Sequence, residues 1–231
     1  MEAIKDKWEE SYKREENFIF YPKEEVVKFM NRFVRKRSGV NEFKDVMDFS
    51  GGVKALDFGC GIGRHAILMR EFGIDAYGVD ISSTAIDVAK DLSETFGFPE
   101  MKENFSTSDG STLAFEDKFF NVTIAESVLD SLGHELAKVN LKEIARVTKD
   151  IIFISLISGD DSKHHREFAD EIVVQDKHEE GTIQNYFNWS KIEELVQEID
   201  FDIVWNRLIQ EESLTSQYRG SRYYIVLKKK G

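Results

Sequence analysis

The chain contains almost no cysteine, and its basic residues are outnumbered by its acidic residues. Its 231 residues include one cysteine, Cys60, so no internal disulfide can form, and no cysteine and histidine have the spacing of a zinc site. We therefore expect a reduced, cytoplasmic protein that holds no metal. The 31 lysines and arginines are outnumbered by 43 acidic residues, and the net charge of −12 disfavours nucleic acid as a partner.

Long apolar runs and prolines are also scarce. The N-terminus is charged, and no uncharged run approaches the ~20 residues that a membrane helix needs, so we expect no membrane association. The chain has two prolines and no repeats that would mark a linker between domains. A chain of 231 residues that is 41% hydrophobic suits one compact α/β domain.

Strand-like and helix-like segments alternate from residue 54 onward. The predicted strands span residues 54–58, 75–80, 104–108, 120–125 and 151–157, and the predicted helices span residues 64–72, 83–96 and 135–147. This alternation predicts a mainly parallel sheet covered by helices on both faces, with ligand sites outside the carboxyl ends of the strands. Two later strand-like runs, 201–209 and 222–227, have no helix between them, which predicts an antiparallel pair.

The segments that flank this alternation are less regular. Residues 22–37 are predicted to form a helix, with Pro22 in its first turn and the basic residues 35–37 in its last. Residues 158–189 are polar and lack periodicity, which predicts a long excursion from the sheet. Order returns at residues 190–193, a capping box that predicts the start of another helix.

A glycine-rich loop joins the first predicted strand to the helix that follows it. Glycines 59, 61 and 63 allow a tight turn and let the backbone approach a ligand without interference from Cβ atoms. Asp57 precedes the loop, and Asp80 ends the next strand, about the 20-residue interval expected for an acid that binds ribose hydroxyls. Glycine spacing alone also occurs in ordinary turns, but the combination with both acids predicts a nucleoside-like ligand.

These residues resemble the class I S-adenosylmethionine-dependent methyltransferase family. The similarity lies in residues 55–64 (ALDFGCGIGR) and 78–82 (GVDIS), and it extends more loosely to residue 156. It implies a three-layer α-β-α Rossmann-like fold, with a mainly parallel sheet of about seven strands and an antiparallel C-terminal strand. The family's Pro-Gly-Gly turn before the fifth strand is absent, because residues 148–150 lead directly into that strand.

The resemblance also implies how S-adenosylmethionine, with S-adenosylhomocysteine as its product, would be held. The implied cofactor-binding residues are Asp57, Gly59, Cys60, Gly61 and Gly63 at the methionine part, Asp80 and Ile81 at the ribose, Asp109 and Gly110 at the adenine, and Glu126 and Ser127 beneath the sulfonium. Acids near the loop suit this cationic cofactor better than a pyrophosphate. Asp109 and Gly110 also form a common turn pair, and no base near Cys60 would activate it as a nucleophile.

The methyl acceptor is not identified by any motif. We expect a small molecule, because the chain is acidic and has no appended basic domain that would favour a nucleic acid. A base is needed only for protonated nucleophiles, so the catalytic residue stays unknown; the candidates are His134 and Asp130, beyond the fourth strand. The adjacent histidines His164 and His165 are a further candidate. They lie in the polar excursion, where they could equally be part of a solvated surface.

The domain organisation follows from these segments. We expect a single methyltransferase domain over 1–231, with a lid or helical segment at 1–40, a cofactor-binding core at 54–156 and an insertion near the acceptor at 158–189. The aromatic N-terminal segment, with Tyr12 and Tyr21, would cover the cofactor as a lid, as in similar methyltransferases, or pack on the sheet. Arg219, near the last strand, would bind an acidic or polyol acceptor or lie at a strand edge.

Other functions are compatible with parts of this pattern. An NAD-linked oxidoreductase would use a similar loop, but its motif prefers glycine where this chain has Arg64. An aminopropyl transferase and a non-catalytic cofactor-binding protein remain alternatives. No feature of the sequence indicates the oligomeric state.

Overall fold

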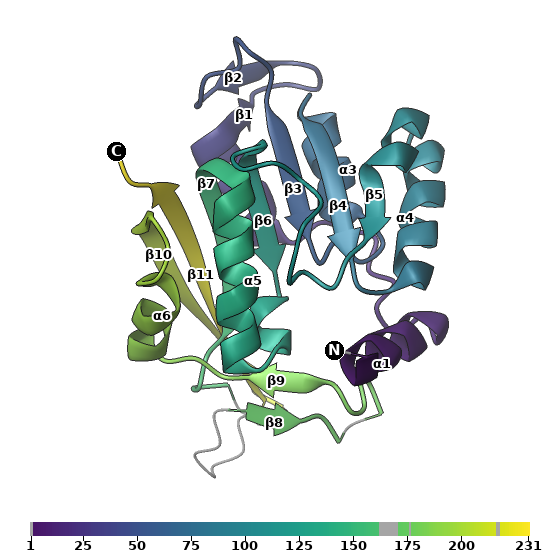
Figure 1. Ribbon diagram of the computed structural model, residues 1–231, viewed down its shortest axis with the longest axis vertical. Coiled ribbons are helices and arrows are strands. Elements are labelled where there is room, and N and C mark those ends of the chain that lie inside the picture. Colours follow the sequence, from purple (N-terminus) through teal and green to yellow (C-terminus); the bar gives the residue numbers. More distant parts are fainter. Residues whose placement is uncertain (1, 162–170, 176, 216–217) are drawn as a thin grey trace.

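The computed structural model describes residues 2–161, 171–175, 177–215 and 218–231. Helical and strand elements alternate along most of this length (Figure 1). The helical elements are α1 (Glu2–Lys13), α2 (Glu24–Phe29), the π-helical turn η1 (Met30–Val34), α3 (Arg64–Glu71), α4 (Ser83–Thr95), the 3-10 turns η2 (Pro99–Asn104) and η3 (Leu129–Ser131), α5 (His134–Val147) and α6 (Trp189–Val196). The strands are β1 (Arg35–Arg37), β2 (Phe43–Asp45), β3 (Lys54–Phe58), β4 (Asp75–Asp80), β5 (Phe105–Thr107), β6 (Phe120–Glu126), β7 (Thr148–Ile157), β8 (Glu171–Val173), β9 (Ile183–Asn185), β10 (Phe201–Glu212) and β11 (Arg219–Lys229).

A sheet with the strand order β10-β11-β7-β6-β3-β4-β5 forms the centre of the described structure. Strands β3, β4, β5, β6 and β7 run parallel to one another, whereas β11 runs antiparallel to both β7 and β10. The predicted mainly parallel seven-stranded sheet with an antiparallel C-terminal strand is therefore confirmed. The chain moves outward from β3 to β5 and then returns to β6, so a topological switch point lies between β3 and β6.

Helices cover both faces of this sheet, which explains why successive residues of its central strands β3, β6 and β7 are buried. One hydrophobic cluster packs α5 and α6 against one face and includes Phe120 and Ile154. A second cluster packs α2, η1, α3 and α4 against the other face around Phe153. Successive residues of β7 thus enter opposite clusters, as the two-residue period of a strand requires.

Two sequence-based predictions of helix boundaries are wrong. The helix expected over 22–37 ends at Val34, and residues 35–37 form β1, paired with β2. The Arg35 side chain binds Asp45 at 2.7 Å and donates to the carbonyl of Phe72, contacts that override the local helical preference. The expected capping box also begins too late: α6 starts at Trp189, and the Asn188 side chain accepts the cap hydrogen bond from the Lys191 amide.

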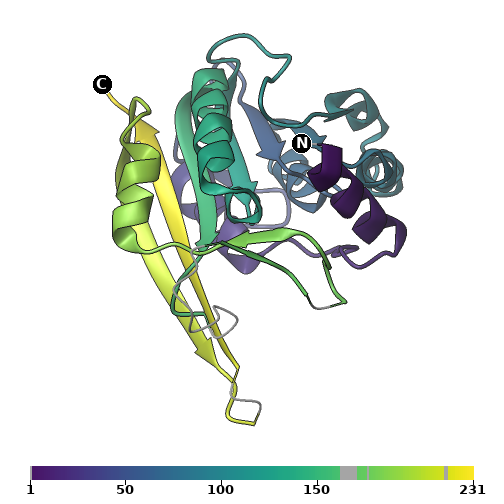
Figure 2. The same ribbon diagram turned by 60° about the horizontal axis from the view of Figure 1, so that its bottom comes forward.

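Two segments that are far apart in the sequence lie across the carboxyl ends of the parallel strands. In Figure 1, α1 and the antiparallel pair β8–β9 are both beneath the tips of β3, β4 and β6, and the turned view of Figure 2 shows them extending toward each other. Residues 171–175 and 177–189 belong to the predicted excursion, so this segment contains two short strands in its described part. None of the helices in the described ranges has the length and apolar character to cross a membrane.

Candidate functional site

The glycine loop after β3 has a backbone that other residues would not adopt easily. Gly59, Gly61 and Gly63 have φ angles of 70°, 52° and 84°. A Cβ on Gly59 would lie 2.3 Å from Cγ2 of Val128, and one on Gly61 would lie 2.5 Å from Oη of Tyr12. Glycine is therefore required here both for the left-handed conformation and for the close approach of side chains.

The carboxylate of Asp80, at the end of β4, holds this loop in place. Its Oδ2 accepts a hydrogen bond from the Gly61 amide at 2.8 Å, and its Oδ1 accepts one from the Ser82 amide at 2.9 Å. Burial raises the pKa of Asp80 to about 6, although these two amide donors oppose the shift. Asp80 is therefore ionised at neutral pH and close to its titration range.

Asp57 supports the loop from below and does not line a cavity. Its Oδ2 accepts a hydrogen bond from the Ala66 amide in the first turn of α3, and its Oδ1 faces Nδ1 of His65 at 3.8 Å. Because Nε2 of His65 accepts a hydrogen bond from the Lys23 amide, the proton of a neutral imidazole lies on Nδ1, toward Asp57. Asp57 and His65 thus form a buried support beneath the loop.

Two adjoining cavities open along the carboxyl edge of the sheet. A large cavity of about 480 Å³ and a small cavity of about 100 Å³ share Trp8, Tyr12, Gly59, Ser127 and Ser131 in their walls. Of the predicted site residues, Cys60, Gly61, Glu126, Asp130 and Tyr21 also line the large cavity. Asp80, Ile81, Asp109 and Gly110 line the small one.

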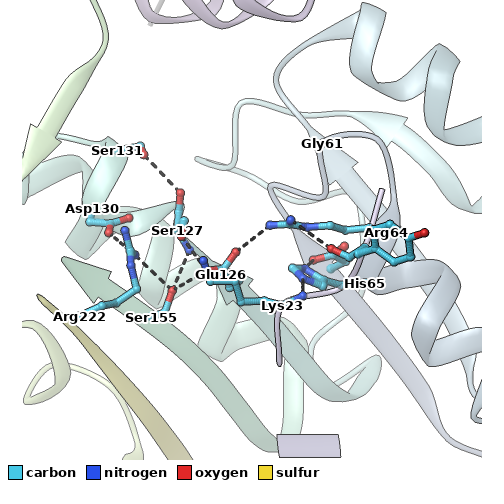
Figure 3. Close-up of polar contacts among 12 residues, drawn as sticks. Lys23, Gly61, Arg64, His65, Glu126, Ser127, Asp130, Ser131, Ser155 and Arg222 are labelled. Carbon is cyan, nitrogen blue, oxygen red and sulfur yellow. Dashed lines mark hydrogen bonds and ion pairs between the residues drawn. The ribbon is translucent and has the colours of Figure 1, made fainter. Parts of the chain in front are cut away.

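Glu126, the last residue of β6, is the centre of a polar network in the wall of the large cavity (Figure 3). Its carboxylate accepts hydrogen bonds from Arg64 at 3.2 Å, from Ser127 Oγ at 2.7 Å and from Ser155 Oγ at 3.3 Å. Burial opposes its ionisation, but His65, Arg222, Ser127 and Arg64 outweigh burial and lower the pKa of Glu126. The wall therefore presents a carboxylate that remains charged at neutral pH.

A second ion pair lies on the other side of Glu126 (Figure 3). Oδ2 of Asp130 binds Nη1 of Arg222 at 2.6 Å and accepts a hydrogen bond from the Ile157 amide at 2.8 Å. Burial raises the pKa of Asp130, although Arg222 and the Ile157 amide act in the opposite direction. Ser155 Oγ, 3.4 Å from Nη1 of Arg222, links this pair to Glu126.

The small cavity contains a buried donor without an acceptor. Asn140, on α5, is 1% exposed, and its Nδ2 has no hydrogen-bond partner among the described residues. A Cβ on Gly110 would lie 2.3 Å from Oδ1 of Asn140, so Gly110 gives this amide its space. Asp109 accepts hydrogen bonds from the amide and hydroxyl of Ser111, which lower its pKa. A planar ligand with an acceptor atom would satisfy Asn140.

Helix α1 contributes Trp8 and Tyr12 to the walls of both cavities. Its Glu9 accepts hydrogen bonds from Ser82 Oγ at 2.7 Å and from Thr84 Oγ1 at 2.6 Å at the start of α4. Tyr12, on the same helix, lies against Gly61, and the carbonyl of Tyr21 accepts a hydrogen bond from Arg64. The N-terminal segment is therefore attached to both sides of the glycine loop.

Four predicted site residues are absent from the cavity walls in the described structure: Asp57, Gly63, His134 and Arg219. The His134 imidazole lies beside Phe187 and 3.5 Å from Glu194 of α6, where it cannot reach the cavities. Arg219 is on the β10–β11 hairpin and pairs with Glu212. His164 and His165 lie outside the described residues, and burial raises the pKa of the Cys60 thiol, which therefore stays protonated.

The sequence did not single out several residues that the fold brings to this site. Glu9, Asn140, Ser155 and Arg222 come from four different elements, α1, α5, β7 and β11. The alternation of β11 contained a signal for Arg222, because it shares a strand face with the buried Tyr224 and Val226, whereas Arg219 does not. Among the described residues, no group of three or more His, Cys, Asp or Glu side chains is arranged to hold a metal ion.

The central part of the chain matches a known protein family. Residues 56–151 match the family described as "Methyltransferase domain". Methyltransferase GfsG of Streptomyces halstedii is 32% identical over 100 residues, which are 40% of this chain and 36% of that protein. The chain spans less than half the length of the curated relatives it matches.

Solved structures share the fold at low sequence identity. A SAM-dependent methyltransferase from Methanosarcina mazei has a TM-score of 0.66 and 21% identity, with 77% of this chain and 92% of that chain covered. A magnesium protoporphyrin IX methyltransferase from Synechocystis with bound SAM has a TM-score of 0.55 and 18% identity, with 78% of this chain and 71% of that chain covered. At these identities the similarity establishes the fold alone.

Proposed function

We propose that this chain, whose residues 56–151 match the methyltransferase domain family, binds S-adenosylmethionine and transfers its methyl group to a small-molecule acceptor. The observation that carries the proposal is the pair of adjoining cavities at the topological switch point, which meet over Gly59 and Ser127. The small cavity would hold the adenosine part, and the large cavity would hold the methionine part together with the acceptor. S-Adenosylhomocysteine is the expected product.

The residues of the small cavity fit an adenosine group. The Asn140 amide is a donor without a partner there, and an adenine ring nitrogen is an acceptor. The carboxylate of Asp80 lies at the end of β4, beside Ile81, where an ionised acid would accept hydrogen bonds from ribose hydroxyls. Asp109 and Gly110 also line this cavity, so the role proposed for these five residues is to bind the nucleoside.

The large cavity fits the charged part of the cofactor. When bound, S-adenosylmethionine would supply an activated methyl group: the acceptor would form a bond to the methyl carbon while the carbon–sulfur bond breaks, and S-adenosylhomocysteine would leave as the neutral thioether. Glu126 remains ionised in the wall and would attract this cation, while Gly59, Cys60 and Gly61 would pack against the methionine chain. Much of the catalysis would then come from positioning, because the methyl group is already activated.

The lining of the large cavity supports a small and polar acceptor. Its side chains include Asn17, Gln184, Ser131, Asp130 and Arg222, together with Glu126 and Arg64. A sterol or another large apolar molecule would displace water from these groups and offer nothing to their remaining donor and acceptor positions, which costs free energy. The net charge of −12 also favours a small molecule over a nucleic acid.

We propose that residues 2–21 act as a lid and that the segment after β7 contributes to the acceptor side. The contacts of Glu9 and Tyr12 support the first role. Glu179 supports the second, because its amide donates to Glu16 and it lines the large cavity with Gln184. Deletion of residues 1–21 should weaken cofactor binding, and an unchanged dissociation constant in a folded variant would refute the lid.

Isothermal titration calorimetry tests the central proposal. S-Adenosylmethionine and S-adenosylhomocysteine should both bind, and NAD should not. Binding of NAD alone would overturn the proposal in favour of an oxidoreductase. Transfer is tested separately by measuring release of S-adenosylhomocysteine over a panel of small polar acceptors, and binding without any release would favour a non-catalytic cofactor-binding protein.

A further inference from the structure

Arg222 occupies an unusual position for a charged side chain. It lies on β11, opposite Ile157 in the register of β11 with β7, and its side chain reaches the wall of the large cavity. Only 23% of the side chain is exposed, and the partner carboxylate of Asp130 is 4% exposed. Figure 3 shows Arg222 and Arg64 on opposite sides of Glu126. The two arginines therefore serve different parts of the cavity.

The guanidinium of Arg222 uses only part of its hydrogen-bonding capacity. Both of its hydrogen bonds to described residues, to Asp130 and to Ser155, are made by Nη1. Nε and Nη2 have no acceptor in the described ranges. Neither nitrogen is fully buried, so both can be reached by solvent or by a ligand. These two nitrogens form one edge of the planar group, the fork that binds a carboxylate or phosphate through two parallel hydrogen bonds.

We propose that Arg222 binds an anionic group of the methyl acceptor, so that the acceptor is a small carboxylate or phosphate compound. The inference rests on the proposed function, because it assigns one side of the same cavity to the acceptor. Asp130 holds Nη1 and so fixes the plane of the guanidinium, while the Nε–Nη2 edge stays available for the ligand. Asp130 is thus a positioning residue for Arg222.

The position of Arg64 distinguishes this role from binding of the cofactor. Arg64 is the first residue of α3, directly after the glycine loop, and it contacts Glu126 from that side. A cofactor carboxylate beside the loop would lie near Arg64, whereas Arg222 comes from the far side of Glu126. Loss of Arg222 should therefore weaken anion binding and leave the affinity for S-adenosylhomocysteine unchanged.

Calorimetry on the full chain saturated with S-adenosylhomocysteine tests the proposal, with malonate and inorganic phosphate as probes. The neutral malonamide serves as the matched control ligand. Wild-type protein should bind one or both anions and not malonamide, and the preferred anion identifies the acceptor as a carboxylate or a phosphate. Arg222→Lys, which keeps the charge but loses the fork, should weaken anion binding by roughly tenfold, the equivalent of one charge-assisted pair.

Removal of Arg222 alone would leave Asp130 buried without its cation, so a paired variant keeps the test valid if the single variant does not fold. Arg222→Gln with Asp130→Asn removes both charges and should also lose anion binding. Arg207→Gln, on the neighbouring strand β10, is the control and should bind anions as the wild type does.

Several outcomes would overturn the proposal. These are no anion binding by the wild-type complex, unchanged binding in the Arg222 variants, or loss of binding in Arg219→Gln instead. A fall in S-adenosylhomocysteine affinity in Arg222→Lys would assign Arg222 to the cofactor. If the wild type does not bind S-adenosylhomocysteine at all, the proposed function fails, and titration of the ligand-free protein still tests the anion site.

Discussion

The contact between Gly61 and Tyr12 predicts a compensating pair of substitutions. In Gly61→Ala, the new Cβ would lie 2.5 Å from Oη of Tyr12, while the next nearest atom of that ring would be 3.5 Å away. One hydroxyl oxygen therefore causes almost all of the overlap. Tyr12→Phe removes this atom, and because Oη makes no hydrogen bond within the described ranges, that change alone should cost about 0.5 kcal/mol or less.

The expected magnitudes follow from the two problems that the alanine creates. The φ of 52° at position 61 costs about 1 kcal/mol for a residue with a Cβ, and overpacking against Tyr12 costs about 1–3 kcal/mol. Gly61→Ala should thus lower the free energy of unfolding by about 2–4 kcal/mol. In the Tyr12→Phe background only the backbone strain of about 1 kcal/mol should remain.

Urea unfolding monitored by tryptophan fluorescence measures these free energies, and calorimetry with S-adenosylhomocysteine measures the effect on the site. Gly59→Ala is the matched control, because its Cβ would meet Val128 and not Tyr12, so Tyr12→Phe should not rescue it. A coupling energy below about 0.5 kcal/mol between positions 12 and 61 would show that α1 does not pack on the glycine loop in solution.

Three further predictions concern the cofactor site. Asp80 becomes protonated in the free protein as the pH falls below about 6. If its ionised form binds the ribose hydroxyls, the affinity for S-adenosylhomocysteine measured by calorimetry should fall about tenfold between pH 7 and pH 5. A similar pH dependence in Asp80→Asn would contradict this prediction. Asn140→Leu should weaken binding of S-adenosylhomocysteine about tenfold, whereas an unchanged dissociation constant would remove this amide from the site. Glu9→Gln should lower the free energy of unfolding in urea by about 1 kcal/mol, because it weakens the attachment of α1 to α4. A decrease no greater than that of the exposed control Glu10→Gln would argue against this attachment.

The proximity of the residues proposed to bind the cofactor was predictable because they belong to segments that are close in sequence. The loop 59–63 and Asp80 lie on adjacent parallel strands, so their spacing along the chain fixes their proximity in space. Asp57 shows the limit of this reasoning. The sequence indicates an acid at a set distance from the loop, but only the fold shows that its carboxylate points to the amide of Ala66 and not to a cavity.

The acceptor side was not predictable because distant segments build it. Asp130 and Arg222 are 92 residues apart and meet only because β11 inserts between β7 and β10. Arg219 was chosen from the same segment as Arg222, although the alternation of β11 places Arg222, and not Arg219, on the face of the buried Tyr224 and Val226. Likewise, Arg35 forms part of β1 because of contacts with Asp45 and Phe72, which local helix propensity does not include.

The charges in the wall suggest why an anionic acceptor suits this cavity. Arg64, Glu126, Arg222 and Asp130 alternate in sign and form two ion pairs linked through Ser155. A sulfonium beside Glu126 and an acceptor anion beside Arg222 would each lie next to a group of opposite charge in this row. Methyl transfer removes the sulfonium charge, so the same wall would hold the products less strongly than the reactants, which favours their release.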